Sequence, residues 1–247
     1  MTRIVNNCVA LVCLCLFWGQ SLRAADASHS EQIKWGNESV FNEEHNTLGL
    51  FSGVLGGQIV LAGGTSDDYS RWGRNAVCLS ENAGFALYED VLSKPLAYGA
   101  SITLSDGILC IGGRDSSQCY EDVFFVTMQQ GKLNVSEDWP PLPFPLSNAA
   151  GALLDNKVYL FGGRKSVSPS RLSDSFFVLD LSNKSRGWKE LPGYPGCVRE
   201  DAILVVQNNG VSPCLYLLGG QTETEEGLSS CLTDGYVYNP QLVNGVH

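Results

Sequence analysis

The sequence predicts an all-β protein with the architecture of a β-propeller, and three observations support this prediction. Four apolar runs each end in a Gly-Gly pair, at residues 63–64, 112–113, 162–163 and 219–220. The second glycines of successive pairs are 49, 50 and 57 residues apart. A unit of about 50 residues is typical of one propeller blade. After the N-terminus, no segment shows the 3.6-residue periodicity of a long helix.

The first two strands of each repeat form a predicted hairpin. Three copies align without a gap, each with two apolar runs around a two-residue turn: residues 51–64, 100–113 and 150–163. Their turns are Gly56-Gly57, Asp106-Gly107 and Asp155-Asn156. Such pairs tolerate positive φ at both positions, as a tight hairpin turn requires. The fourth copy, residues 202–220, has a longer turn around Asn208-Asn209-Gly210.

Two further strands complete each predicted repeat. After Gly-Gly comes a polar loop and then a third strand, expected at 122–127, 174–181 and 234–239. A fourth strand carrying Trp139 or Trp188 follows in the second and third copies, and we expect both tryptophans in blade cores. In the first copy these strands are expected at 76–80 and 83–90. Four antiparallel strands in sequence order form the blade of a kelch-repeat propeller.

The repeats divide residues 28–247 into four predicted blades, near residues 48–90, 96–143, 146–193 and 198–240. A segment near 31–40 contains Trp35 and is expected to be a latch strand, which belongs to a blade shared by both termini. A latch implies a final blade beyond these four. We therefore expect an incomplete ring of about four kelch blades out of six. The sequence leaves open whether the chain is truncated or is completed by another chain.

The N-terminus has the composition of a secretory signal peptide. Arg3 supplies a positive charge, residues 4–18 are mostly apolar, and Ala25-Asp26-Ala27 offers a small-x-small cleavage site. We interpret residues 1–27 as a cleaved signal, with an uncleaved anchor as the alternative. The mature protein is then expected to be periplasmic or secreted, with no stable membrane insertion.

The charge balance argues against nucleic acid and anionic membranes as partners. The formal net charge is −10, and residues 1–27 carry two arginines and one aspartate, so their removal takes it to −11. A small anionic ligand remains possible, because a channel can be locally basic. Six cysteines follow the signal: Cys78, Cys110, Cys119, Cys197, Cys214 and Cys231. An oxidising compartment would permit disulfides, with the pairing left open.

Propeller topology predicts a substrate site on one rim. The start of each first strand and the end of each second strand meet there, near the central channel. Strand starts carry Tyr98, Asn148 and Arg199, and strand ends carry Arg114 and Arg164. We expect these five residues to bind substrate, because the planar fork of arginine pairs bidentately with a carboxylate.

Each of these residues also has a structural interpretation. Arg114 and Arg164 could bridge blades by pairing with Asp122 or Asp174, and Tyr98 and Asn148 could serve in packing and loop capping. Residues 199–201 could form a solvated charged cluster. No cofactor or metal is expected, since the three histidines are scattered and no glycine pair is followed by a phosphate-binding lysine.

Two segments carry a more specific resemblance. Residues 94–113, with Ala-Tyr-Gly, and residues 191–202, with Pro-Gly-x-x-Arg, are similar to bacterial kelch proteins of the N-acetylneuraminate epimerase family, also called sialic acid mutarotases. The cyclically permuted branch of that family is the most similar. The resemblance implies a six-bladed periplasmic or secreted enzyme that interconverts the α and β anomers of N-acetylneuraminate. It therefore implies a small acidic sugar as substrate.

The resemblance also bears on catalytic residues. The family places a Glu and an Arg in the loop after a Gly-Gly-like motif, and Arg171 fits that Arg. The position expected for the Glu holds Arg164, so Glu121 and Glu200 are candidates for acid–base transfer on topology alone. Two other interpretations of the function stay open. One is a non-catalytic kelch module that binds carbohydrate or protein, and the other is a truncated, inactive relative.

Overall fold

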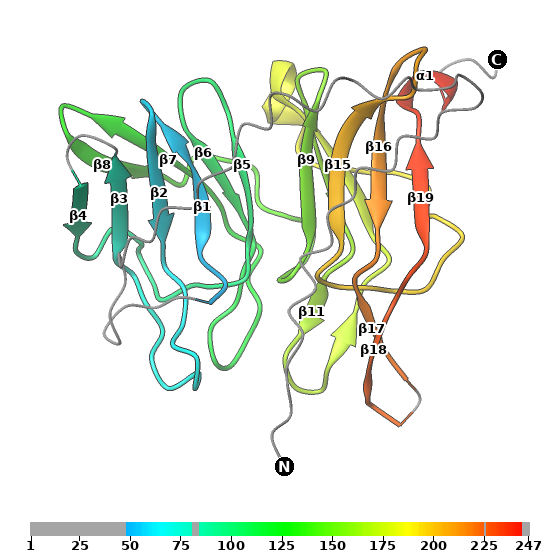
Figure 1. Ribbon diagram of the computed structural model, residues 1–247, viewed down its shortest axis with the longest axis horizontal. Coiled ribbons are helices and arrows are strands. Elements are labelled where there is room, and N and C mark those ends of the chain that lie inside the picture. The colour runs from blue at the N-terminus through cyan, green and yellow to red at the C-terminus, as the bar shows by residue number, and fades with distance from the viewer. Residues whose placement is uncertain (1–47, 81–83, 225, 244–247) are drawn as a thin grey trace, which may run out of the picture. The chain divides into compact units, whose positions relative to one another are not determined.

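The computed structural model describes residues 48–80, 84–224 and 226–243, all of which lie in one compact unit spanning 40–247 (Figure 1). These residues form antiparallel sheets in the order of the chain, and the predicted all-β propeller class is confirmed. The expected signal peptide and latch strand lie outside the described residues. None of the helices in the described part is long and apolar enough to cross a membrane.

Four sheets correspond to the four repeats. The first contains β1 (Phe51–Leu55), β2 (Gln58–Ala62), β3 (Ala76–Ser80) and β4 (Gly84–Tyr88). The second contains β5 (Ala100–Thr103), β6 (Ile108–Ile111), β7 (Val123–Gln129) and β8 (Lys132–Ser136). The third contains β9 (Ala150–Leu154), β10 (Lys157–Phe161), β13 (Phe176–Asp180) and β14 (Lys189–Glu190). The fourth contains β15 (Ile203–Asn208), β16 (Pro213–Leu218) and β19 (Gly235–Tyr238).

Smaller elements extend the loops after two of the Gly-Gly pairs. These are the hairpins of β11 (Arg164–Ser166) with β12 (Arg171–Leu172) and of β17 (Gln221–Glu223) with β18 (Ser229–Cys231). The described residues also include a 3-10 helix, Leu181–Arg186, and a single helical turn, α1 (Pro240–Val243). The arrows in Figure 1 show how β11, β12, β17 and β18 project beyond the ends of the main strands.

The prediction that Trp139 and Trp188 lie in fourth strands is wrong. Strand β8 ends at Ser136, before Trp139, and β14 begins just after Trp188. Both side chains nevertheless pack against the second hydrophobic cluster, and Trp188 Nε1 donates a hydrogen bond to the carbonyl of Pro140 at 3.0 Å. The indole therefore joins two loop segments, and its place in the core does not require a strand.

Two of the three predicted tight turns have positive φ at both positions. The angles are 56° and 79° for Gly56-Gly57, and 49° and 57° for Asp155-Asn156. The prediction is wrong for Asp106-Gly107, because Thr103 pairs with Ile108 and the connection is four residues long. Gly107 is needed there for space, since a Cβ at that residue would lie 2.3 Å from the Phe125 ring.

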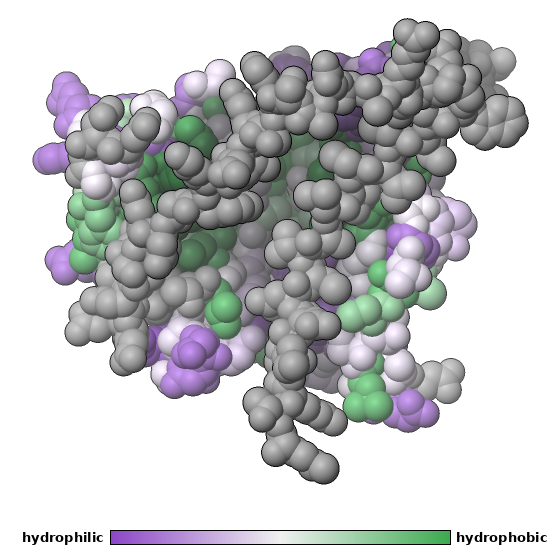
Figure 2. All heavy atoms as spheres, in the orientation of Figure 1, coloured by the Kyte–Doolittle hydropathy of each residue, from purple (hydrophilic) through white to green (hydrophobic). Residues whose placement is uncertain are grey.

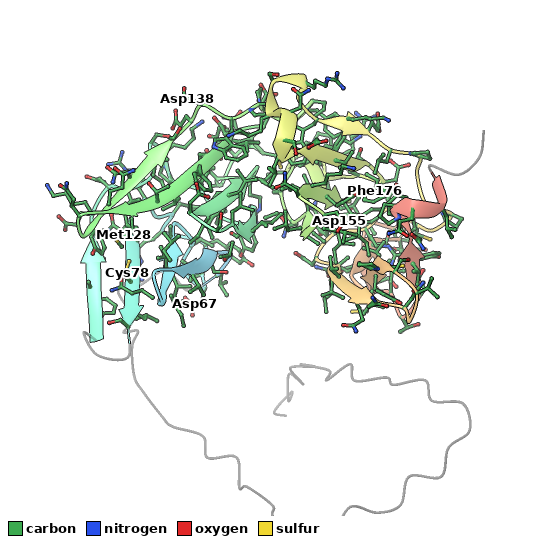
Figure 3. All side chains as sticks on the ribbon, turned by 90° about the horizontal axis from the view of Figure 1, so that it is seen from above. Asp67, Cys78, Met128, Asp138, Asp155 and Phe176 are labelled. Carbon is green, nitrogen blue, oxygen red and sulfur yellow. The ribbon has the colours of Figure 1, made fainter. Side chains whose placement is uncertain are left out.

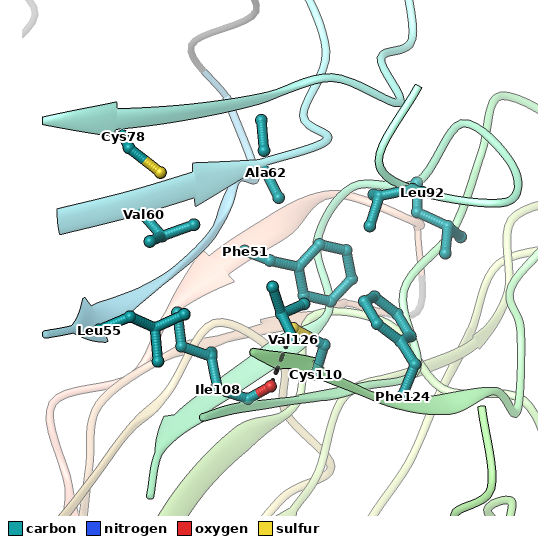
Figure 4. Packing of buried hydrophobic residues seen from close by; sticks show 12 residues of the cluster. Phe51, Leu55, Val60, Ala62, Cys78, Leu92, Ile108, Cys110, Phe124 and Val126 are labelled. Atoms are coloured by element: carbon teal, nitrogen blue, oxygen red, sulfur yellow. Dashed lines mark hydrogen bonds between the residues drawn. The ribbon is translucent and has the colours of Figure 1, made fainter. Parts of the chain in front are cut away.

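Hydrophobic side chains fill the spaces between successive sheets. Strand β1 contacts β5, β5 contacts β9, and β9 contacts β15, so the first strands of neighbouring sheets lie side by side. In the cluster of Figure 4, Phe51 of the first sheet packs edge-on against Phe124 of the second, with ring centroids 5.2 Å apart. Val60 and Cys110 are buried in the same cluster. Burial of this apolar area is what holds one blade against the next.

The Gly-Gly pairs are the points where one sheet meets the backbone of the next. Gly112 has φ 63°, and a Cβ on it would lie 2.2 Å from the carbonyl oxygen of Leu146. That same carbonyl accepts a hydrogen bond of 2.8 Å from the N–H of Gly113. Because only glycine leaves room for this approach, the repeated pairs bring the start of each blade to the end of a strand in the blade before it.

The described cysteines form no disulfide in this structure. Four of them, Cys78, Cys110, Cys119 and Cys214, are buried, whereas Cys197 and Cys231 are exposed. The buried thiols act as small apolar groups in the core. Cys110, for example, lies in the first cluster beside Ile108 and Val126 (Figure 4).

Candidate functional site

Four residues, one from the start of each blade, form a continuous hydrogen-bonded chain at the rim. The N–H of Tyr98 donates to the carbonyl of Gly49 at 2.7 Å, that of Asn148 to Tyr98 at 2.6 Å, and that of Asp201 to Asn148 at 3.0 Å. All four have φ between 52° and 64°. They line a cavity of about 280 Å3, and we call them the ring positions.

Tyr98 is the unexpected member of the ring positions. Asn and Asp tolerate the left-handed conformation and Gly adopts it freely, but a bulky side chain there is rare. Such a residue costs about 1–3 kcal/mol and is retained where the surroundings determine it, often at functional sites. The Tyr98 ring lies directly over Gly49, where an added Cβ would be 2.8 Å from it. Burial and a hydrogen bond with Tyr69 raise the pKa of the Tyr98 phenol.

The prediction that Arg199 shares the rim with Tyr98 and Asn148 is wrong, because Asp201 takes that position. Tyr98 and Asn148 precede the first Gly of their pairs by fourteen residues, and Asp201 precedes Gly219 by eighteen. The whole hairpin of β15 and β16 accounts for the difference, because Ile203 pairs with Leu218 fifteen residues later, whereas Ala150 of β9 pairs with Phe161 eleven residues later. Arg199 instead corresponds to Leu96 and Leu146, since the carbonyls of all three accept from the second glycine of the preceding pair.

Arg199 is fully buried and its donors are occupied. Two guanidinium nitrogens bond the carboxylate oxygens of Asp234 at 2.7 and 2.8 Å. One of these two, Nη1, also donates to the Gly219 carbonyl, and Nε donates to the Tyr194 hydroxyl, both at 2.8 Å. The hydrogen bonds from Arg199 hold the pKa of Asp234 down at about 2, so the pair stays charged. A side chain with no exposed surface cannot contact a solute, and this arginine is structural.

Arg114 has a different environment. Its backbone pairs with Ala97, next to the ring positions, and its guanidinium lies 4.6 Å from the ring centroid of Tyr98 and 5.0 Å from that of Trp72. Within the described residues no carboxylate pairs with it, and one N–H donates to the carbonyl of Asp115 at 3.3 Å. Aromatic faces hold a guanidinium by cation–π attraction without neutralising its charge. Sequence reasoning missed Trp72, whose only signal is its place in the polar loop after a Gly-Gly pair.

Arg164 is close to the rim but its charge is compensated. Two of its nitrogens bond the Glu200 carboxylate at 2.8 and 2.5 Å, and one of these also bonds Glu223 at 3.0 Å. The Glu200 hydrogen bonds raise the pKa of Arg164, which therefore stays charged. The alternative pairing with Asp174 is not formed, and Asp122 bonds Lys94 instead. Glu200 is thus at the rim, as predicted, but bound to an arginine.

The remaining predicted catalytic residues lie apart from the cavity. Arg171 is exposed on β12, where its backbone is opposite Ser166, and Glu121 is exposed before β7. Within the described part of the chain, neither side chain is hydrogen-bonded or ion-paired to Arg114, Glu200 or the ring positions. Their catalytic roles remain predictions.

Cys119, whose backbone pairs with that of Arg114, is buried with its Sγ 3.4 Å from the hydroxyl of Ser147. Burial raises the pKa of this thiol, which disfavours the reactive thiolate. The described residues include no cluster of three metal-binding side chains. Charge at this site comes from Arg114, Asp201 and the cluster of Arg164 with Glu200 and Glu223.

Comparison with known proteins matches part of this chain to one family. Residues 139–244 match the family model of N-acetylneuraminate epimerase. Proteins named N-acetylneuraminate epimerase are 31% identical over 105 residues in Haemophilus influenzae (strain PittEE) and over 108 residues in Yersinia pestis (strain Pestoides F). These alignments cover 42% and 43% of this chain and 25% of each relative. A kelch domain-containing protein of Vibrio cholerae is 32% identical over 104 residues, which are 42% of this chain and 26% of that protein.

The solved structure of YjhT superimposes with a TM-score of 0.60 at 14% identity, covering 77% of this chain and 68% of that one. This likeness concerns the fold. The repeated sheets and Gly-Gly contacts define a kelch-type β-propeller protein. The resemblance indicated by the sequence is confirmed for residues 139–244, which are similar to members of the N-acetylneuraminate epimerase family. The match spans about a quarter of the length of these curated relatives.

Proposed function

We propose that the rim binds a small acidic sugar and that the protein interconverts the anomers of N-acetylneuraminate or a similar sugar acid. The observation that carries this proposal is the Arg114 guanidinium, which packs against the ring of Tyr98, a residue that lines the cavity, and against the ring of Trp72. It is paired with no carboxylate of the described residues. The names of the matched relatives support the substrate class.

The chemistry of the rim fits an anion with an apolar face. Arginine can bind a carboxylate through two parallel N–H···O bonds, which fix orientation as well as charge. Trp72 and Tyr98 are both only half-buried, and their rings add apolar surface next to the guanidinium. Because the protein carries a net charge of −10, a locally uncompensated arginine is a selective place for an anion.

Anomer exchange requires two proton transfers. A base takes the proton of the anomeric hydroxyl, and the ring oxygen gains a proton as the ring opens. A positioned side chain typically contributes about 10²–10⁴-fold to such transfers. Since a carbon–oxygen bond breaks and re-forms with proton transfer and no net oxidation or reduction, we expect the reaction to need no added cofactor.

The test pairs binding with exchange. We expect Arg114→Met to weaken binding of N-acetylneuraminate by at least about tenfold, because one charge-assisted bidentate contact is lost. Titration calorimetry measures the affinity. NMR of freshly dissolved sugar measures the rate of anomer equilibration. Arg186→Met is the matched control, because Arg186 is exposed in the 3-10 helix beyond the opposite end of β13.

Equal binding by both variants would remove Arg114 from the proposal. A wild-type protein that equilibrates the anomers no faster than buffer would remove the enzymatic activity while leaving binding in place.

A non-catalytic carbohydrate-binding module is the second candidate. The observation that favours it is the ion pair of Glu200 with Arg164, which occupies a carboxylate that was expected to transfer protons. Tight sugar binding without faster exchange would support this candidate. Absence of both binding and exchange would indicate an inactive relative.

We also propose that the mature protein is periplasmic or secreted, on the composition of residues 1–27. N-terminal sequencing of protein expressed in its host tests this. A mature chain that still begins at Met1 in the cytoplasmic fraction would refute it.

A further inference from the structure

We propose that Asp201 is the catalytic carboxylate that moves the proton during anomer exchange, in place of the predicted Glu200. This inference rests on the proposed function, since it concerns the same site and the same sugar. It starts from the position of Asp201, which is exposed and lines the cavity of about 280 Å3 together with Tyr98 and Asn148.

Asp201 is held rigidly from both sides. Asn148 Nδ2 donates to one carboxylate oxygen at 2.9 Å, and Gln221 Nε2 donates to the other at 2.7 Å. Its backbone N–H bonds the carbonyl of Asn148, and its φ is 52°. A proton-transferring group needs this kind of fixed orientation, because catalysis depends on the geometry of the reacting atoms.

The carboxylate keeps room for a substrate proton. An ionised carboxylate has about four acceptor positions on its two oxygens, and each oxygen of Asp201 uses one for its amide partner. No arginine or lysine pairs with Asp201 in the described part of the chain, so no cation competes for the remaining positions. Gln221 is itself fixed, since its side-chain carbonyl accepts a hydrogen bond from the Ser229 hydroxyl at 2.5 Å.

Glu200, one residue earlier, is in the opposite situation. Its side chain is only 8% exposed and both oxygens bond the Arg164 guanidinium. Taking up a proton there would break a largely buried ion pair. Because successive side chains point in different directions, the two neighbouring carboxylates have different roles. Glu200 holds Arg164, and Asp201 faces the cavity.

The reaction step balances without another reactant. One carboxylate oxygen of Asp201 accepts the proton of the anomeric hydroxyl while the bond between the anomeric carbon and the ring oxygen breaks. The electron pair of the broken bond stays on the ring oxygen, which takes the proton back from the carboxyl group. The product is the open-chain carbonyl form with a free hydroxyl. Ring closure on the other face of the carbonyl reverses these steps.

Asp201→Asn is the direct test. It retains the shape and the tolerance of positive φ but removes the base, so we expect the exchange rate at saturating sugar to fall by about 10²–10⁴-fold. We expect the dissociation constant of N-acetylneuraminate to change by less than about threefold, because the substitution removes an interaction that is made only in the transition state. The matched control is Asp155→Asn, an exposed aspartate that also has positive φ, in the turn between β9 and β10 (Figure 3).

Two further variants separate the roles. Asp201→Gly also accommodates positive φ and should lose exchange to the same extent if the first variant folds poorly. Glu200→Gln should retain exchange to within about tenfold in a folded protein, because it only weakens the hold on Arg164. Full exchange activity in folded Asp201→Asn, or a larger loss in Glu200→Gln, would overturn the assignment. Failure of the wild type to accelerate exchange would instead refute the proposed function, independently of Asp201.

Discussion

A single substitution within the repeat, arginine in place of leucine, changes how the last blade is held. Leu96 and Leu146 are buried where their blades join the preceding ones, and Arg199 occupies the same position in the fourth blade. A charge can be buried there because the Asp234 carboxylate carries the opposite charge and accepts two hydrogen bonds from the guanidinium. Asp234 itself is partly open to water, with 38% of its side chain exposed, whereas Arg199 has none.

This difference in exposure predicts that replacing Asp234 and replacing Arg199 lower the free energy of unfolding by different amounts. Asp234→Asn leaves a fully buried guanidinium without its counter-charge, which typically costs about 3–5 kcal/mol. Arg199→Leu restores the residue found in the second and third blades and leaves a carboxylate that water can reach. We therefore expect Arg199→Leu to lower the free energy of unfolding by at least about 1 kcal/mol less than Asp234→Asn does. Urea denaturation measures both, and equal costs would contradict this account of the pair.

At the scale of the element, the Gly-Gly pair acts as a joint between blades. Its first glycine has positive φ in every copy, but the space around it differs along the chain. An added Cβ would lie 2.2 Å from the Leu146 carbonyl at Gly112, whereas at Gly219 the nearest atom is 3.4 Å away. The difference arises because the backbone of a following blade passes over Gly112.

Gly112→Ala and Gly219→Ala form a matched pair of variants for this joint. Both incur the cost of alanine at positive φ, about 1–2 kcal/mol. Only Gly112→Ala must also displace the Leu146 carbonyl and its hydrogen bond to Gly113, which adds about 1–3 kcal/mol. Urea unfolding midpoints compare the two variants. A loss of stability at Gly219 as large as at Gly112 would show that φ alone explains the motif.

At the scale of the whole molecule, both terminal sheets expose apolar side chains. In the first sheet Val54, Ile59 and Leu87 are each about half exposed, and in the fourth sheet so are Ile203 and Val237. On the face drawn in Figure 2, hydrophobic residues lie at the surface beside hydrophilic ones. Apolar sheet faces of this kind tend to associate, because removing apolar surface from water lowers the free energy.

We therefore predict concentration-dependent self-association through these faces. The double variant Ile203→Thr, Val237→Thr should shift the equilibrium toward the monomer at little cost in stability, since both side chains are already exposed. Sedimentation velocity over a range of concentrations measures this. Val211→Thr with Leu228→Thr is the matched control, because these exposed residues lie in turns away from the sheet face. Unchanged association in the first variant would exclude the fourth sheet as the contact surface.

Sequence reasoning was most successful where a residue type has one structural use. Each Gly-Gly pair followed an apolar strand, and the Asp155-Asn156 turn has the predicted positive φ. It failed where the repeats differ in length. The longer fourth hairpin gives no fourteen-residue spacing to Gly219, and the prediction put Arg199 at the strand start, whereas Gly49 has that spacing in the first blade. Nothing in the spacing could show that Asp201 faces the cavity.

The sequence by itself determined the repeat, the all-β class and the rim on which strand starts and strand ends meet. These follow from local patterns, because glycine at positive φ and alternating apolar runs act within one blade. Only the tertiary structure decided which charges are free. Arg114, Arg164 and Arg199 are the same residue type near one rim, but an arginine acts on a ligand only if no carboxylate distant in the sequence pairs with it first. Asp234, Glu200 and Glu223 pair with two of the three, and Arg114 packs against two aromatic rings.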